Sequence, residues 1–385
     1  MGVFVTDGHW RKTLAVVRSL GRRGIRVTVG ESTRIATSFF SKYCGKRVVY
    51  PSPFREPHGF LQHLRREVSD GYRAIFPMEE ETLLLLARHR DLFDRSVLLP
   101  IPGYEKIQFV RDKERLLKFA MAKGIPSPRT FFFENPDEVR TSRVELPAVI
   151  KPRISSGAFG IRYVTEAKDV VPAYLEVHRK YPLPLIQERI PREGDSFGVS
   201  ALFDEDSRVR AAFVHRRLRE YPISGGPSTL RESVSHPQVL ELGLSLLRAL
   251  DWFGVAMVEF KVDPRDNTPK LMEVNPRFWG SLQLAVFSGV DFPYLIYLMA
   301  KGERFKPVLT YEIGRRSRWL LPGDLFHFLR NPHRFHLCPS FFDFFDENTC
   351  YDILSRDDPC PALGRVLTLL PLLYDRDMRR FLAPR

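Results

Sequence analysis

Three polar side chains recur at every second position in the segment "LMEVNPRFWGS", which covers residues 271–281: Glu273, Asn275 and Arg277. Successive side chains of an extended chain point to opposite faces, so an acid, an amide and a guanidinium would share one face of a strand. The segment directly follows an apolar run. The pattern therefore indicates a polar site on an otherwise buried strand.

The preceding residues predict the partner of this strand. "VAMVEFKVD", the turn "PRDNTP" and "KLMEVNP" are typical of a β-hairpin, and a symmetric fold about Asp266 places Glu259 directly opposite Glu273. Like charges about 5 Å apart destabilise a strand pair unless a cation lies between them, and Mg²⁺ prefers such oxygen ligands. Asn275 adds a neutral oxygen, and Arg277 offers a donor fork for phosphate or carboxylate. The alternative is two surface strands whose acids lie in water.

Length and composition limit the class of protein. A chain of 385 residues is too long for one compact core, and 44% hydrophobic with 27% charged residues is the balance of a globular protein. The net charge of +13 favours an anionic partner, which could be nucleotide phosphate, nucleic acid or a membrane surface. The basic residues form no block and no aromatic–basic motif, so we expect no nucleic-acid binding. We also expect a cytoplasmic protein with no transmembrane segment, because no apolar run could span a bilayer.

The cysteines leave two interpretations. The chain has four of them and no CxxC pair, and three fall near His333 and His336. A zinc site is conceivable there, but the spacings match no standard zinc motif, so we expect buried free thiols in a reducing compartment. The four are Cys44, Cys338, Cys350 and Cys360.

The N-terminal residues alternate between short β-branched runs and helical patterns. This order predicts a parallel sheet with helices on its faces, a Rossmann-like domain. The first run ends in "TDGH", at the carboxyl end of a strand, where open α/β sheets bind ligands; alternatively, Asp7 caps the next helix. There is no GxGxxG fingerprint, so we do not expect NAD. The runs are residues 2–5, 25–29, 46–50 and 73–77.

The rest of the chain carries further elements. One amphipathic helix is predicted between the Pro/Gly boundaries of residues 100–128, followed by buried strands and by a long helix over "HPQVLELGLSLLRALDWFG". After about residue 304 the pattern predicts short helices and loops. That last segment could cover the active site, form a dimer or touch a membrane, and we expect a dimer contact or a lid.

Taken together, "MVEF" and "LMEVNPRFWGS" resemble the metal-binding core of the ATP-grasp superfamily, which includes the carbamoyl-phosphate synthetase large chain and the carboxylate–amine ligases. Several segments match in the same order up to about residue 305. The resemblance implies an α/β and α+β fold. Its parts would be a Rossmann-like pre-ATP-grasp domain (1–103), subdomain A (104–186), subdomain B with the metal site (187–305) and a small, mostly helical C-terminal extension (306–385).

Two segments resemble the phosphate-binding parts of that family. "FVRDKERL" matches the segment whose lysine approaches the nucleotide phosphates, here Lys113, although such a lysine could equally lie on a helix surface. "AVIKPRISSGAFGI" matches the strand that ends in a second phosphate-binding lysine, here Lys151. The lid loop after it would contribute Ser156 and Gly157, but it has fewer glycines than the family pattern.

Two further segments complete the implied site. "LIQERIPREGDSFGVS" resembles the strand at the adenine pocket, and "HRRLREYPISGGPST" ends a strand in basic side chains beside a Gly-Gly loop. We expect Arg216 or Arg217 to bind phosphate, and we predict that Arg216 is a catalytic residue. The alternative is that both arginines lie on a solvated basic face. The implied adenine residues are Glu188, Arg189 and Ile190, and the ribose would be held by Asp195 or Glu193.

The resemblance implies an ATP-dependent ligase for a small carboxylate and an amine. Two Mg²⁺ ions, or Mn²⁺, would be held by Glu259, Glu273 and Asn275, while Lys151 and Arg277 would stabilise an acyl phosphate that the amine attacks, releasing ADP and phosphate. One alternative is a phosphoryl-transfer enzyme like carbamoyl-phosphate synthetase that forms no amide. A second is a non-catalytic nucleotide-binding protein. A homodimer is the expected assembly if the C-terminal segment makes the contact.

Overall fold

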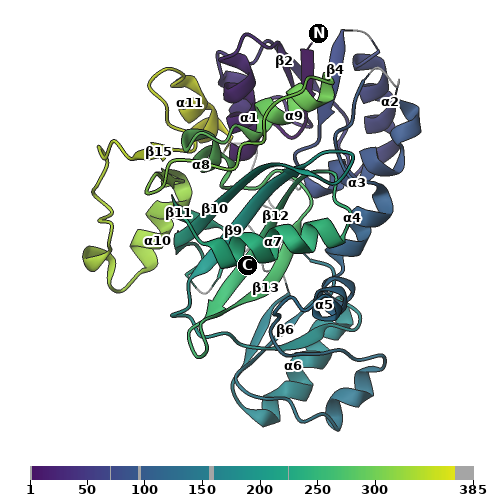
Figure 1. Cartoon of the computed structure of the whole chain (residues 1–385), viewed down its shortest axis with the longest axis vertical. Coiled ribbons are helices and arrows are strands. Elements are labelled where there is room, and N and C mark those ends of the chain that lie inside the picture. The colour runs from purple at the N-terminus through teal and green to yellow at the C-terminus, as the bar shows by residue number, and fades with distance from the viewer. Residues whose placement is uncertain (1, 70, 94–96, 156–159, 224, 369–385) are drawn as a thin grey trace.

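The computed structural model describes residues 2–69, 71–93, 97–155, 160–223 and 225–368 (Figure 1). The N-terminal part is a parallel sheet of four strands in the order β3-β2-β1-β4, whose apolar central strands are buried on both faces. The predicted parallel sheet is confirmed, with its second strand starting two residues later than expected. The elements are β1 (Gly2–Val5), α1 (Arg11–Gly21), β2 (Val27–Glu31), η1 (Thr37–Phe40), β3 (Lys46–Val49), α2 (Pro57–Glu67), β4 (Tyr72–Phe76), α3 (Glu80–Arg88) and η2 (Arg90–Leu92).

The amphipathic stretch that follows forms two helices, α4 (Tyr104–Arg111) and α5 (Lys113–Ala122), so the prediction of a single helix was wrong. Asp112 separates them, because its carboxylate accepts from the backbone N–H groups of Glu114 at 3.0 Å and Arg115 at 3.4 Å. A side chain that binds the backbone in this way starts a new helix. The break fixes Lys113 at the first position of α5.

A small antiparallel sheet comes next, at the bottom of Figure 1, in the order β5-β8-β6-β7. Helix α6 covers it and buries Val170, Tyr174 and Val177 against the sheet. Lys151 and Glu188 are the last residues of two adjacent strands. The elements are β5 (Thr130–Phe131), η3 (Pro136–Arg140), β6 (Ala148–Lys151), β7 (Arg162–Val164), α6 (Ala167–Lys180) and β8 (Leu185–Glu188).

The centre of the molecule is a seven-stranded sheet in the order β13-β12-β9-β10-β11-β14-β15. Helix α7 covers one face, with Val199 and Val258 in the core beneath it. The other face, with Leu202 and Met257, shares a core with α8, α9 and the N-terminal sheet. The elements are β9 (Ser196–Phe203), β10 (Val209–Glu220), β11 (Ser228–Ser233), α7 (Pro237–Ala249), β12 (Gly254–Asp263), β13 (Thr268–Asn275), α8 (Leu282–Phe287) and α9 (Phe292–Ala300).

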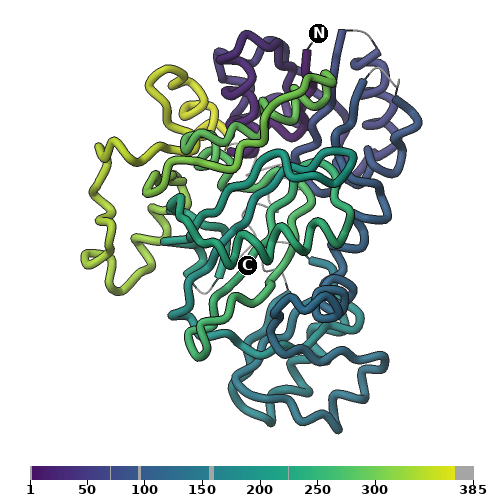
Figure 2. Tube along the Cα trace, in the orientation of Figure 1, coloured from purple at the N-terminus to yellow at the C-terminus, as the bar shows by residue number. Residues whose placement is uncertain are grey.

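The C-terminal segment is more than short helices and loops, which corrects the prediction. β14 and β15 extend the central sheet beyond β11, and α11 packs against η1, so that segments from opposite ends of the sequence lie side by side (Figure 2). The elements are β14 (Arg316–Arg318), η4 (Leu320–Asp324), α10 (Leu325–Arg330), η5 (Arg334–His336), β15 (Thr349–Tyr351) and α11 (Cys360–Leu367).

The four cysteines are free thiols. Cys338 and Cys360 are exposed, so the expectation of burial was wrong for these two. Within the described ranges, no group of three or more His, Cys, Asp and Glu side chains could hold a metal ion, and this excludes the zinc alternative there. Over the same residues, no helix is long and apolar enough to cross a membrane.

Candidate active site

The hairpin of β12 and β13 places Glu259 directly opposite Glu273, the pairing that the sequence predicted. The hairpin is not symmetric about Asp266, because Phe260 pairs with Leu271. A β-bulge then places Met272 as an extra residue before Glu273. Without the bulge, Glu259 would face Met272 and the two carboxylates would lie out of register. The bulge is therefore what brings the two acids together.

The two carboxylates form one cluster with an amide. Asn275 donates from Nδ2 to Oε1 of Glu259 at 3.3 Å and to Oε1 of Glu273 at 3.2 Å. Burial raises the pKa of Glu259 to about 7; Arg217 opposes the shift, whereas Glu273 and Glu220 add to it. The site therefore favours a protonated Glu259 unless a cation binds beside it. Two carboxylates and an amide oxygen, which the Asn275 side chain presents after a half-turn, fit a hard divalent cation.

The adjacent arginines of β10 lie on opposite faces. Arg217 forms an ion pair with Glu259, and its guanidinium also lies 3.9 Å from Glu220. Arg216 instead pairs with Asp195 at 3.3 Å and with Glu232 at 3.1 Å. The position of Arg216 does not support its choice as the catalytic arginine, because strand alternation turns it away from the carboxylate pair. Arg217 is the one that joins the cluster.

Three lysines surround the same place. Lys151, at the end of β6, donates from Nζ to Oε1 of Gln187 at 2.7 Å. Burial lowers its pKa to about 8, and the charges of Lys113 and Lys261 lower it further, while Glu273 opposes the shift. The sequence analysis missed Lys261, although the alternation that was applied to Glu259 puts Lys261 on the same face of β12. An array of ammonium groups beside two carboxylates suits a polyphosphate and its metal ion.

Lys113 is positioned by the start of α5. Its backbone N–H donates to the Arg153 carbonyl at 2.9 Å, and its Nζ donates to the Ser155 carbonyl at 2.7 Å. Its ammonium is thereby directed to the strand end that carries Lys151. The lid-loop residues predicted next to it, Ser156 and Gly157, lie outside the described residues.

The strand predicted at the adenine pocket is present, and its residues form hydrogen bonds with other parts of the protein. The Glu188 carboxylate accepts from Lys270 at 2.9 Å and from Arg265 at 2.7 Å, and these partners hold its pKa below the usual range against the effect of burial. The Arg189 N–H donates to the Pro147 carbonyl at 3.0 Å. Ile190 is buried. The position of this segment is thus fixed by partners on three neighbouring segments.

The two ribose candidates differ in their surroundings. Asp195 is half exposed and pairs with Arg216, as described above. Glu193 is exposed, and its negative charge acts to raise the pKa of Lys261. Both acids lie between the end of β8 and the start of β9, beside the lysine array.

Comparison with known proteins agrees with this geometry. Residues 187–319 match the family "ATP-grasp in the biosynthetic pathway with Ter operon". The structure superposes with a TM-score of 0.64 on a biotin carboxylase domain dimer of Hydrogenobacter thermophilus 2-oxoglutarate carboxylase, in complex with MgADP, ADP and bicarbonate. The identity is 15%, over 82% of this chain and 73% of that one. Residues 187–319 are thus similar to an ATP-grasp family, and the fold of the chain is similar to that of the carboxylase domain.

Two other proteins that are similar to this chain carry ligase names. An L-amino acid ligase from Bacillus licheniformis superposes with a TM-score of 0.61 at 15% identity, over 78% of this chain and 74% of that chain. A D-aspartate ligase from Enterococcus faecium (strain Aus0004) is 22% identical over 228 residues, which cover 54% of this chain and 53% of the relative. The chain therefore spans about half the length of that relative.

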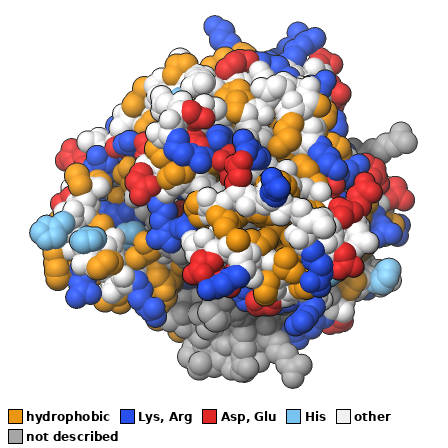
Figure 3. All heavy atoms as spheres, turned by 90° about the horizontal axis from the view of Figure 1, so that it is seen from below, with side chains coloured by type: hydrophobic (Ala, Val, Ile, Leu, Met, Phe, Trp, Pro, Cys, Tyr) orange, Lys and Arg blue, Asp and Glu red, His pale blue; other side chains and the backbone are white. Residues whose placement is uncertain are grey.

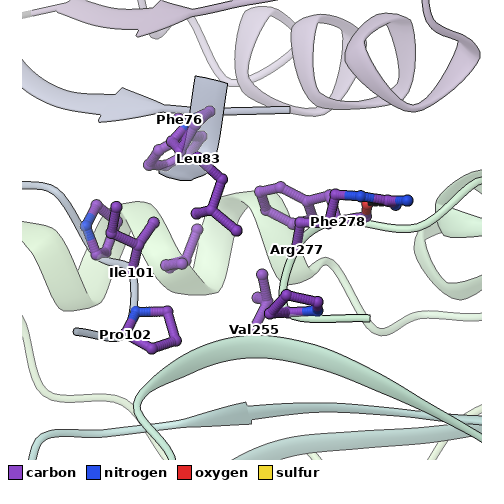
Figure 4. A pocket seen from close by; sticks show the side chains of 11 residues that line it. Phe76, Leu83, Ile101, Pro102, Val255, Arg277 and Phe278 are labelled. Atoms are coloured by element: carbon purple, nitrogen blue, oxygen red, sulfur yellow. Dashed lines mark hydrogen bonds between the residues drawn. The ribbon is translucent and has the colours of Figure 1, made fainter. Parts of the chain in front are cut away.

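Arg277 lies at the junction of the central sheet with the N-terminal sheet. It lines a small apolar pocket with Phe76, Ile101 and Phe278, and its guanidinium points away from the pocket (Figure 4). The charges of Glu79, Glu80 and Glu273 raise its pKa, despite the opposing effect of burial. Arg277 therefore faces acids from both parts of the molecule.

The N-terminal loops complete the wall opposite the hairpin. Lys12 forms an ion pair with Glu79 and donates to the Phe278 carbonyl at 3.3 Å; burial and the charge of Arg277 lower its pKa to about 8. Asp7 accepts from the Glu79 N–H at 2.9 Å and from the Thr82 hydroxyl at 2.7 Å. Asp7 thus fixes the start of α3 rather than capping the next helix, which corrects the alternative given for "TDGH".

Proposed function

We propose that this protein is an ATP-dependent ligase that joins a small carboxylate to an amine or a related nucleophile through an acyl phosphate. The observation that carries the proposal is the convergence of Lys113, Lys151 and Lys261 beside the opposed carboxylates Glu259 and Glu273. The lysines offer charge to phosphates, and the carboxylates offer oxygen ligands to a metal ion. The two ligase relatives and the MgADP-bound neighbour support this assignment.

ATP would lie along the small sheet. Its phosphates would face Lys113 and Lys151, while its adenine would contact Glu188, Arg189 and Ile190. Asp195, or Glu193, would hold the ribose. Two Mg²⁺ ions, or Mn²⁺, would neutralise the charge that develops on the phosphates when bound by Glu259, Glu273 and Asn275.

The substrate carboxylate would enter between the hairpin and the N-terminal loops. Its oxygen attacks the γ-phosphorus, the bond to the bridging oxygen breaks, and ADP leaves. Lys151, Arg217 and Arg277 hold the phosphoryl oxygens, because each presents positive charge to this space. The amine then attacks the acyl carbon and phosphate departs. Proximity and charge supply the catalysis, and no covalent enzyme nucleophile is needed.

The acids that face Arg277 have a second use in this scheme. Glu79 and Glu80 come from the N-terminal part and lie opposite the phosphate site. Both acids already form ion pairs, Glu79 with Lys12 and Glu80 with Arg111. An ammonium substrate that displaced these partners would be held on this side, and it would have to release a proton before its nitrogen could attack the acyl carbon.

Conversion of ATP to ADP in the presence of carboxylate and amine pairs tests the proposal, with amino acids as the first panel because both ligase relatives are named for them. The variant Glu273→Gln is expected to lose turnover by about a thousandfold or more, since it removes a ligand charge from the metal site. Glu241→Gln, on the exposed face of α7, is the matched control and should keep wild-type turnover.

The products separate the alternatives. An amide together with ADP and phosphate supports the ligase, whereas a free phosphorylated product with no need for an amine supports the phosphoryl-transfer enzyme. Wild-type turnover in a folded Glu273→Gln variant would contradict the metal assignment. Absence of turnover with nucleotide binding retained would favour a non-catalytic protein.

A further inference from the structure

The segment from α10 to β15 carries an unusual surface away from the proposed active site. We call residues 325–342 the aromatic–basic segment, which corrects the statement that the chain has no aromatic–basic motif. No Asp or Glu occurs between Asp324 and Asp343, while Arg330 and Arg334 lie among phenylalanines and histidines. The segment lies at the left of Figure 1, and Figure 3 shows hydrophobic, basic and histidine side chains together along the left edge. This chemistry has no part in the proposed ligase reaction.

Large apolar side chains on this surface are exposed to water. The exposed fraction is 71% for Phe335, 56% for Phe342, 53% for Leu329 and 41% for Phe326. Phe345, which follows the segment and is flanked by Asp343, Asp346 and Glu347, reaches 88%. A fully exposed aromatic ring forgoes about 1.5–3 kcal/mol of free energy that its burial would provide. Several such rings in one short segment therefore mark a binding surface rather than scattered exposure.

The rings are held in place by an inner aromatic cluster. Phe328 stacks on Phe341 with ring centroids 4.3 Å apart, and it meets Phe335 and Phe342 edge-on at 5.6 and 5.5 Å. Arg334 lies over the ring of Phe335 at 5.4 Å. The exposed rings of Phe335 and Phe342 are thus supported from behind, and the cation of Arg334 lies beside Phe335, the most exposed ring of the segment.

A buried charge network fixes the base of the segment. Asp324 accepts from Arg219 at 2.8 Å and from Arg318 at 2.6 Å, and all three are buried. The same arginines donate to the carbonyl groups of Pro339 and Phe341. The protein therefore holds both ends of the segment against the central sheet, and the exposure of its tip is part of the fold.

We propose that the aromatic–basic segment docks this protein on an anionic lipid bilayer. Aromatic rings partition into the boundary between headgroups and acyl chains, and adjacent arginines reach the lipid phosphates. Each basic residue near an anionic surface strengthens binding about fivefold. The net charge of +13 acts in the same direction by attracting the whole molecule to such a surface.

Charge also decides against a second copy of the chain as the occupant. A twofold contact places the same patch on both sides, and residues 325–342 bring Arg330 and Arg334 but no acid, so each copy would add positive charge to the contact. A bilayer surface rich in phosphate supplies the missing negative charge.

Co-sedimentation of the full chain with lipid vesicles at about 0.15 M salt tests the proposal. We expect binding to mixed phosphatidylcholine–phosphatidylglycerol vesicles and little binding to pure phosphatidylcholine. Arg330→Ala with Arg334→Ala should weaken the binding about 30-fold. Phe335→Ser with Phe345→Ser should weaken it at least tenfold, and ATP turnover should stay unchanged in both double variants.

Matched controls lie on the N-terminal part. Arg65→Ala with Arg66→Ala removes two exposed arginines of α2, and Phe54→Ser removes a ring that is 46% exposed. Both should bind anionic vesicles like the wild type; an equal loss in the controls would overturn the proposal, since total charge alone would then explain the binding. Absence of vesicle binding, or a dimer in sedimentation velocity that only the Phe335→Ser, Phe345→Ser variant disrupts, would also overturn it.

Discussion

At the scale of single residues, Lys151 links pH to nucleotide affinity. Burial and two neighbouring lysines lower its pKa to about 8, so the free protein loses this proton as the pH rises through 8. Bound phosphates would hold the proton on, because they favour the charged form. The dissociation constant of a non-hydrolysable ATP analogue should therefore be flat below pH 8 and rise toward tenfold per pH unit above it.

Isothermal titration calorimetry between pH 7 and pH 9.5 would measure this profile. Lys151→Arg keeps the charge across the whole range, so its profile should be flat even if its affinity is lower. Equal slopes for the wild type and Lys151→Arg would show that another group titrates. In that case Lys151 would not be the residue that contacts the phosphates.

The neighbouring arginines of β10 offer a second test at this scale. Arg217 pairs with Glu259, whereas Arg216 pairs with Asp195 and Glu232. Arg217→Met should lower kcat about 100-fold, because it removes a charge that stabilises the transferred phosphoryl group. Arg216→Met should raise KM for ATP a few-fold and leave kcat nearly unchanged. Steady-state kinetics would separate the two, and the reverse pattern would restore Arg216 as the catalytic arginine.

At the scale of elements, local pattern predicted much of the site. The alternation of Glu273 and Asn275 and the hairpin turn predicted the carboxylate pair, although the observed pairing also depends on a β-bulge. The bulge at Met272 could not be predicted, because it depends on how two strands pair over several residues. The same limit applies to Arg216 and Arg217, since either could face the site until the register of β10 is known.

Long-range pairing explains the other differences between sequence and structure. β14 and β15 are short, and they become strands because β14 pairs with the edge of β11 and β15 then pairs with β14. The division of α4 from α5 depends on Asp112, whose side chain also meets Arg153 from the phosphate loop. Neither feature has a strong local signal, so composition and periodicity predicted loops in one case and one helix in the other.

Strand β9 requires a glycine at position 198. Gly198 lies between Glu259 and His215 in the sheet, and a Cβ at this position would come within 2.3 Å of the His215 ring. That ring is buried beside Ser281, whose hydroxyl lies 3.2 Å from its Nε2, and burial lowers the pKa of His215 to about 3. The ring is therefore neutral and has no solvent into which it could move.

Gly198→Ala should destabilise the protein by about 1–3 kcal/mol through this overpacking. Urea denaturation followed by circular dichroism would measure the change. Gly59→Ala in α2 is the matched control, because the added Cβ finds only ordinary contacts, at 3.4 Å or more, and should stabilise the helix by about 0.5–1 kcal/mol. Equal effects of the two substitutions would contradict the role given to Gly198.

At the scale of the whole molecule, buried ion pairs join distant parts of the sequence. Arg18 of α1 pairs with Asp358 near the end of the described chain. Asp352, after β15, meets both Arg11 and Arg231, so it ties the N-terminal part to β11. The C-terminal segment is therefore part of the core architecture. The sequence analysis predicted only short helices and loops there. It could not predict this role, because charge pairs between residues more than a hundred positions apart leave no periodic signal.

Asp324 allows the strength of this arrangement to be measured. It is completely buried between Arg219 and Arg318, so Asp324→Ala would leave two buried guanidinium groups without their counter-ion. Loss of one partner from a buried pair costs about 3–5 kcal/mol. Asp357→Ala, which removes a partner of the half-exposed Arg22, should cost about 1 kcal/mol or less. Urea denaturation of both variants would show the contrast, and a small effect of Asp324→Ala would mean that the C-terminal segment is held by its apolar contacts instead.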